Sequence, residues 1–88
     1  MADYAVTFAR SARKELEVLP HQLADRVLAK IETLAVEPRP VGSLKLHGGR
    51  NHWRVRVGDY RVVYSVNDST RVVDISIIRH RRDVYRDL

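Results

Sequence analysis

Residues 53–64 read WRVRVGDYRVVY, and this stretch decides the fold. Apolar residues alternate with arginines on both sides of Gly58-Asp59, which is the pattern of a β-hairpin closed by a two-residue turn. With such a turn Arg56 faces Arg61 across the hairpin, and both share a face with Arg54, while the valines point into the core. Because like charges placed directly opposite each other destabilise a sheet, this pair indicates that the face binds an anion.

The rest of the chain predicts two helices and one strand before the hairpin, and one strand after it. Alternation of apolar and polar residues predicts the strands, and apolar residues spaced three and four apart predict the helices, which meet at Pro20. Prolines and glycines indicate a loop before the hairpin, in which residues 44–46 form a short extended or packed anchor. The predicted segments are a strand at 3–8, helices at 9–19 and 20–36, a loop at 37–51, and strands at 52–57, 60–66 and 71–79.

Helices near the start and strands near the end indicate an α+β fold of order β-α-α-β-β-β rather than a parallel α/β sheet. The helical hairpin is expected to cover one face of a small, mainly antiparallel, twisted sheet. The chain of 88 residues suits a single domain spanning 1–88 with a thin core. In the last strand, alternation places Ile77 with the core and puts Ile78 and His80 on the face of the arginines.

The composition favours an anionic partner in the cytoplasm. Sixteen basic residues against eleven acidic ones give a formal net charge of +5, which suits nucleic acid, an acidic protein or an anionic membrane surface. The absence of cysteine excludes disulfide and thiolate chemistry and fits a reducing cytoplasm. No apolar run approaches the roughly 18 residues that span a bilayer, and residues 5–9 are too short for a signal peptide. We therefore expect a cytoplasmic protein without a membrane partner.

A second basic stretch, RHRRDVYR at residues 79–86, brings more cations towards the face of the hairpin arginines. It also carries an imidazole, His80, and a phenol, Tyr85. Guanidinium groups bind phosphate through two donors at once, so the combination suits a phosphodiester. The structural alternative is a solvated basic face, with His80 capping a strand end and Tyr85 packing on the core. His47 and His52 lie five apart without a cysteine or a His-Glu motif, so no metal site is predicted.

These motifs resemble the RelE/ParE superfamily of bacterial type II toxin–antitoxin toxins. The resemblance spans nearly the whole chain, through the helix at 12–16, the loop at 44–48, the hairpin at 53–64 and the closing motif at 80–85. It implies a RelE-like fold. For the RelE branch it implies a ribosome-dependent endoribonuclease that enters the A site and cuts mRNA by attack of the RNA 2′-OH on the adjacent phosphate, without a metal or other cofactor. For the ParE branch it implies inhibition of DNA gyrase. A further alternative is a domain that binds RNA or protein without cleaving it.

In both branches the resemblance implies a cognate antitoxin that wraps and neutralises the toxin. The charge of +5 independently favours an acidic partner. The antitoxin peptide is expected to pack a helix or strand against the helical hairpin or a sheet edge and to hinder access to the arginines. The toxin–antitoxin complex is expected to bind operator DNA through the antitoxin.

The resemblance also implies roles for individual residues. Arg54 and Arg56 fill two basic positions that are lysines in the best-known members. Arg61 and Arg81 match family arginines suited to stabilise the charge of a phosphorane-like transition state. Tyr85 matches the family tyrosine, which stacks on a base or protonates the 5′ leaving oxygen.

An arginine at position 54 changes the assignment of the base. A guanidinium is effectively always protonated, so proton abstraction must move to another group. His80 is the candidate, since an unperturbed imidazole titrates near ~6.5. The predicted catalytic residues are Arg54, Arg61, His80, Arg81 and Tyr85. The predicted phosphate contacts are Lys45, Arg56, Arg79 and Arg82.

Overall fold

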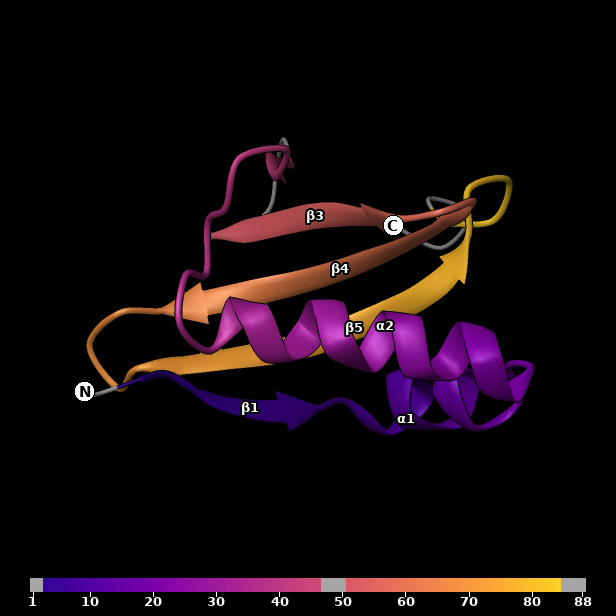
Figure 1. Cartoon of the computed structure of the whole chain (residues 1–88). Helices are drawn as coiled ribbons and strands as arrows, with labels where there is room; N and C mark the ends of the chain where they lie inside the picture. Colours follow the sequence, from indigo (N-terminus) through magenta and orange to yellow (C-terminus); the bar gives the residue numbers. More distant parts are fainter. Residues whose placement is uncertain (1–2, 47–50, 85–88) are drawn as a thin grey trace.

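The computed structural model describes residues 3–46 and 51–84, which form two helices and a five-stranded sheet (Figure 1). The strands lie in the order β1-β5-β4-β3-β2, with β1 parallel to β5 and all other neighbours antiparallel. The predicted α+β class, with a helical hairpin packed on a mainly antiparallel sheet, is confirmed. The elements are β1 (Ala5–Phe8), α1 (Arg10–Glu17), α2 (His21–Leu34), β2 (Leu44–Lys45), β3 (His52–Val57), β4 (Tyr60–Asn67) and β5 (Val72–His80).

Both helices are shorter than predicted. The first ends at Glu17 because Pro20 disfavours helical geometry in the residue before it. The second ends at Leu34, and the prolines that follow cannot continue a helix. The predicted anchor at 44–46 contains a two-residue edge strand, which adds one strand to the predicted order. No helix in the described ranges is long and apolar enough to cross a membrane.

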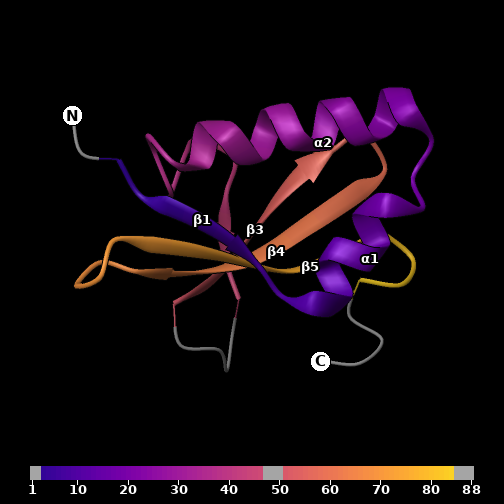
Figure 2. The same cartoon turned by 90° about the horizontal axis from the view of Figure 1, so that it is seen from below.

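The core lies between α2 and one face of the sheet (Figure 2). The predicted apolar face of α2 is confirmed, since Val27, Ile31 and Leu34 are at most 2% exposed. Burial of each such side chain stabilises the fold by about 1.5–3 kcal/mol. We call the other sheet face the open face, because no described helix covers it. The buried sheet residues that pack towards the helices are Val55, Val57, Val62, Tyr64, Val66, Val73, Ile75 and Ile78.

A β-bulge in β5 reverses the predicted faces of its second half. The register between β4 and β5 shifts after Val63, where Ile77 pairs with Val63 but Ile75 pairs with Tyr64. Ser76 is therefore the extra residue, and every later side chain changes face. The prediction that Ile77 faces the core and Ile78 the arginines was wrong. Both isoleucines are buried, but on opposite faces.

The open face carries a small apolar cluster of its own. Val63 from β4 and Ile77 from β5 pack there with Val84, which follows β5 in the chain. Leu46, just after β2, packs against the same cluster. Val84 is 1% exposed, so residues 81–84 must turn from the end of β5 onto the open face. The fold thus brings the segment after β5 onto the face that carries the hairpin arginines.

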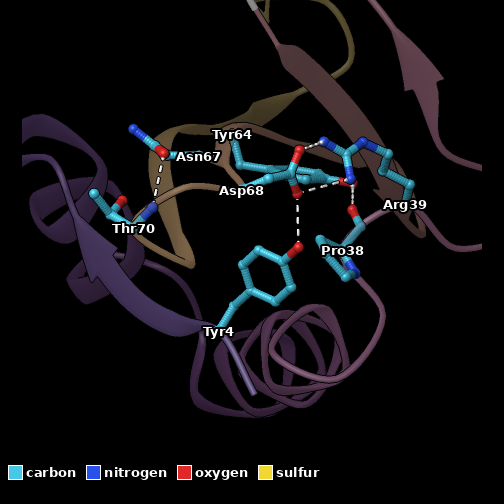
Figure 3. A network of polar contacts seen from close by, with 7 residues as sticks. All are labelled: Tyr4, Pro38, Arg39, Tyr64, Asn67, Asp68 and Thr70. Atoms are coloured by element: carbon cyan, nitrogen blue, oxygen red, sulfur yellow. Dashed lines mark hydrogen bonds and ion pairs between the residues drawn. The ribbon is translucent and has the colours of Figure 1, made fainter. Parts of the chain in front are cut away.

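An ion pair fastens the end of the sheet that lies far from the hairpin turn (Figure 3). Arg39 donates to both carboxylate oxygens of Asp68, at 3.3 and 2.8 Å, and stacks over Trp53. The hydroxyl of Tyr4 donates to the same carboxylate at 2.6 Å. The hydrogen bond from Arg39 lowers the pKa of Asp68, and the bond to Asp68 raises the pKa of Tyr4. These contacts join the residue before β1, the loop after α2 and the turn after β4.

A buried tyrosine anchors that loop to the core. The hydroxyl of Tyr64 on β4 donates to the carbonyl of Pro38 at 2.6 Å (Figure 3). Tyr64 is fully buried, and burial raises its pKa to about 12. The loop after α2 is thereby held against the sheet, which positions the following β2 at the edge beside β3.

Candidate functional site

Three arginines stand side by side across neighbouring strands of the open face. The hairpin register predicted from the sequence is confirmed, since Arg56 pairs with Arg61 between β3 and β4. Arg61 in turn pairs with Arg79 between β4 and β5. Neighbouring strands lie about 4.8 Å apart, so the three side chains start within roughly 10 Å. We call Arg56, Arg61 and Arg79 the arginine row.

The hairpin turn ties Arg61 and the segment after β5 to one end of the sheet. Gly58 has a φ of 58°, as the first position of a type II′ turn requires. The guanidinium of Arg61 donates to the carbonyl oxygens of Gly58 and Tyr60, at 3.2 and 3.1 Å. The backbone N–H of Arg81 donates to the carbonyl of Asp59 at 2.7 Å. Arg81 is therefore held beside the turn, with its side chain exposed.

Arg54 lies on the same face, further from the turn along β3. It is half-buried, and its strand neighbours are Val63 on β4 and Leu44 on β2. Its Nε atom is buried and has no hydrogen-bond partner in the described part of the chain. An unsatisfied buried donor costs roughly 1–3 kcal/mol, so Arg54 is held in this position at some cost to the stability of the fold. The predicted placement of Arg54, Arg56 and Arg61 on one face is confirmed.

Arg79, at the other end of the row, is engaged by a carboxylate from α1. Its Nε donates to Oε2 of Glu15, and the two side chains are 22% and 23% exposed. The second oxygen, Oε1, accepts the backbone N–H of Ile78 at 2.9 Å. The predicted proximity of Arg79 to the hairpin arginines is confirmed, and the structure adds a counter-charge that the local sequence does not indicate.

The prediction that His80 faces the same way as the arginines was wrong. The bulge turns it to the helical side, where it pairs with Tyr60 and meets that ring edge-on with centroids 5.6 Å apart. His80 lines an open hollow of about 370 Å³ beside β5, together with Glu15, Val18 and Arg79. Its Nδ1 accepts the backbone N–H of Arg82 at 3.2 Å. This contact matches the structural alternative, a histidine that caps a strand end.

The other predicted phosphate contacts are more scattered. Lys45 pairs with Trp53, which places it on the helical side, away from the arginine row, and its contact with phosphate stays a prediction. Leu44, its neighbour on β2, takes the open face instead. Arg82 is exposed in the turn after β5. Tyr85 lies outside the described residues.

His52 is a residue of this face that the sequence reasoning missed. It stands two positions before Arg54 on β3, opposite Ser65 on β4, and it is half-buried. Its Nδ1 is buried without a hydrogen-bond partner among the described residues. The alternation that places Arg54 and Arg56 on one face extends to position 52 and would have found it. Within the described ranges, no three histidine or acidic side chains lie close enough to hold a metal ion.

Comparison with known proteins decides the family. A family model described as "ParE toxin of type II toxin-antitoxin system, parDE" matches residues 6–85. The chain belongs to the RelE/ParE superfamily of type II toxins. Toxin RelG of Mycobacterium tuberculosis is 33% identical to this toxin over 88 residues, and the alignment covers 94% of this toxin and 97% of RelG.

Solved structures agree with the fold of this toxin. The RelE–RelB complex from the archaeon Pyrococcus horikoshii matches with a TM-score of 0.80 and 35% identity, covering 92% of this toxin and 97% of that chain. The intact RelBE toxin–antitoxin complex of E. coli matches with a TM-score of 0.78 and 25% identity, covering 88% of this toxin and 95% of that chain. Both are complexes of a toxin with its antitoxin.

Proposed function

We propose that this toxin is a metal-independent endoribonuclease that cuts mRNA in the ribosomal A site and is silenced by an acidic antitoxin. The observation that carries the proposal is the open face, which gathers Arg54, Arg56 and Arg61 around an apolar floor. In the described part of the chain, neither Arg54 nor Arg56 has an acidic partner. A polyanion is the ligand that such a surface suits. The similarity to RelG and to the archaeal RelE supports the RelE branch.

Cleavage by this route needs charge stabilisation rather than a covalent enzyme intermediate. The 2′-oxygen bonds to phosphorus while the bond from phosphorus to the 5′ oxygen breaks, leaving a 2′,3′-cyclic phosphate and a 5′-OH. Negative charge rises on the phosphoryl oxygens, and Arg61 and Arg81 beside the turn supply donors for it. Arg54 and Arg56 bind the flanking phosphates, with Arg82 at the periphery.

Two protons must also move during this reaction. The acceptor of the 2′ proton must face the RNA, and guanidinium groups cannot serve. Of the three imidazoles described, His21 lies at the start of α2 and His80 is on the helical side with Nδ1 engaged, whereas His52 shares the open face with Arg54. We therefore assign the base to His52 in place of His80. Tyr85 keeps its role as donor to the 5′ leaving oxygen or as a stacking platform.

The antitoxin proposal rests on charge and on the neighbouring structures. The toxin carries a net charge of +5, and several of the similar solved structures are complexes of RelE with RelB. An acidic antitoxin segment packed on the helical hairpin or a sheet edge would reduce access to the arginines. Operator DNA is bound by the complex through the antitoxin, and the toxin acts in the cytoplasm.

A second function is inhibition of DNA gyrase. It is favoured by the family model that matches this toxin, which is described as a ParE toxin. Fold alone does not separate the two activities, because both branches share it. The arginines of the open face would then bind gyrase or its DNA, and no RNA would be cut.

The deciding experiment is primer extension on an mRNA translated in a purified system. We expect new 5′ ends with wild-type toxin only when ribosomes are present. Arg61→Ala and Arg81→Ala should both abolish them. The matched control is Lys30→Ala, which removes one positive charge from α2 on the helical side and should leave cleavage intact. Uncut mRNA with wild-type toxin would overturn the nuclease, and a supercoiling assay on gyrase would then test the second function.

A further inference from the structure

The edge of β5 is completed by a side chain rather than by a strand. β1 pairs with β5 only as far as Phe8 and Ile75, so the later part of that edge has no strand beside it. A backbone N–H left without an acceptor there would be costly or would invite another strand. Oε1 of Glu15 accepts the N–H of Ile78 at 2.9 Å and prevents this. α1 thus supplies a carboxylate in the plane of the sheet edge.

The same carboxylate also neutralises one end of the arginine row. Its other oxygen, Oε2, accepts a hydrogen bond from Nε of Arg79. Arg79 stands next to Arg61 in the row, so without Glu15 three like charges would follow one another across β3, β4 and β5. Both partners are less than a quarter exposed, and salt screens a partly buried pair less than an exposed one. The guanidinium of Arg79 is therefore largely unavailable to anions in solution.

We propose that Glu15 is a specificity-determining residue, an internal carboxylate that competes with RNA phosphates for Arg79 and lowers the affinity of the toxin for free single-stranded RNA. Carboxylate and phosphate oxygens accept the same guanidinium donors, so one excludes the other at a given N–H. The inference rests on the proposed function in one respect, that the anion bound by this face is an RNA phosphate. It does not depend on cleavage or on the ribosome.

Glu15→Gln separates the charge from the edge contact. The amide oxygen of glutamine still accepts the N–H of Ile78, so the sheet edge stays closed, but the charge opposing Arg79 is gone. Binding is measured by fluorescence anisotropy with a short 2′-O-methyl oligoribonucleotide, which has no 2′-OH to attack. One added phosphate contact should steepen the slope of log K against log salt by about 0.7. On that slope, affinity rises about eightfold near 50 mM salt and about twofold or less near 0.5 M.

The matched control is Glu17→Gln, on the same helix. Glu17 is also near an arginine, Arg13, but at 3.9 Å with both side chains well exposed. The substitution Glu17→Gln removes the same charge at a place away from the arginine row. It should change the slope of log K against log salt by less than half as much as Glu15→Gln does. Equal effects of the two variants would overturn the proposal, because the gain would then follow from net charge alone. So would a gain from Glu15→Gln that persists when Arg79→Gln is added.

A second measurement needs no variant and covers the case in which Glu15→Gln fails to fold. The Nε–H resonances of the arginines are followed by NMR in wild-type toxin during titration with the same oligonucleotide. At half saturation, Arg79 should shift much less than Arg56. If the Nε–H resonance of Arg79 shifted as much as that of Arg56, Glu15 would not be keeping Arg79 from binding RNA. Loss of ribosomal cleavage would leave both measurements unaffected, so failure of the proposed function and failure of this inference are distinguishable.

Discussion

Replacing Arg56 with glutamine is expected to make the toxin more stable while weakening its hold on RNA. Arg56 is exposed and stands directly opposite Arg61, so its charge opposes folding. In the described part of the chain its side chain makes no hydrogen bond or ion pair that the substitution would break. Arg61 is different, because its guanidinium binds the carbonyls of Gly58 and Tyr60. Arg56 is therefore the member of the pair whose removal isolates the repulsion.

The magnitude follows from the spacing of the strands. Directly opposed residues have Cβ atoms about 4.5–5.5 Å apart, and such like-charged pairs cost roughly 0.2–1 kcal/mol. Two unit charges about 5 Å apart in water repel by about 0.8 kcal/mol, which agrees with that range. For a domain of this size, 1 kcal/mol shifts Tm by about 4–8 °C, so Arg56→Gln should raise Tm by about 1–8 °C.

Thermal and urea unfolding, followed by circular dichroism at low and at high salt, tests the reasoning. The gain should shrink near 1 M salt, where the Debye length is about 3 Å. Arg82→Gln is the control for stability, because it removes an exposed arginine from a turn rather than from a cross-strand pair. The RNA affinity of Arg56→Gln should fall, and its salt slope should flatten by about 0.7. A stability loss, or a gain that high salt leaves unchanged, would refute the account.

Four other substitutions test three separate parts of the structure. Tyr64→Phe leaves the carbonyl of Pro38 unsatisfied and should cost about 1–3 kcal/mol in urea unfolding. Because burial raises the pKa of Tyr64 to about 12, the folded toxin keeps a proton that the unfolded chain releases, so wild type should lose stability between pH 10 and 12 that Tyr64→Phe does not lose. Gly58→Ala places a side chain at a φ of 58° and should cost about 1–2 kcal/mol in thermal unfolding. His52→Gln should slow ribosomal cleavage by about 100-fold or more, and His80→Gln should cost less; the reverse order would restore His80 as the base.

The hairpin and α2 are predictable because one local rule determines each of them. A two-residue turn leaves one pairing of the strands, so Arg56 must face Arg61. The apolar spacing of α2 leaves one face, on which Val27 and Ile31 are buried. In both segments the local pattern and the tertiary contacts agree, and the predicted face is the observed one.

The contacts of Glu15 and Lys45 lie beyond such local rules. Glu15 and Arg79 are 64 positions apart, and neither local sequence indicates the other. Their meeting depends on where β1 ends and α1 begins beside β5. Lys45 belongs to a strand of two residues, which is too short for alternation to show its side. Only the pairing with Trp53 decides that it lies on the helical side.

The bulge at Ser76 determines which side chains of β5 lie on the open face. Continued alternation from Ile75 would have placed Arg79 on the helical side and His80 among the arginines. The adjacent pair Ile77 and Ile78 gives no signal of the bulge, because neighbouring strand residues lie on opposite faces with or without it. The extra residue sends Ile78 to the helices and Ile77 to the open face. It also brings Arg79 into register with Arg61.

One extra residue therefore exchanges an imidazole for a guanidinium at the end of the arginine row. The same exchange brings Arg79 within reach of Glu15, so the third cation arrives together with its counter-charge. A variant without Ser76 could form either a regular β5 strand or the contacts of Arg79 with Arg61 and Glu15, but not both. If it kept the strand, Arg79 would leave both Arg61 and Glu15, and the arginine row would lose its third cation together with the counter-charge of that cation. The bulge therefore determines which side chains meet at the end of the arginine row.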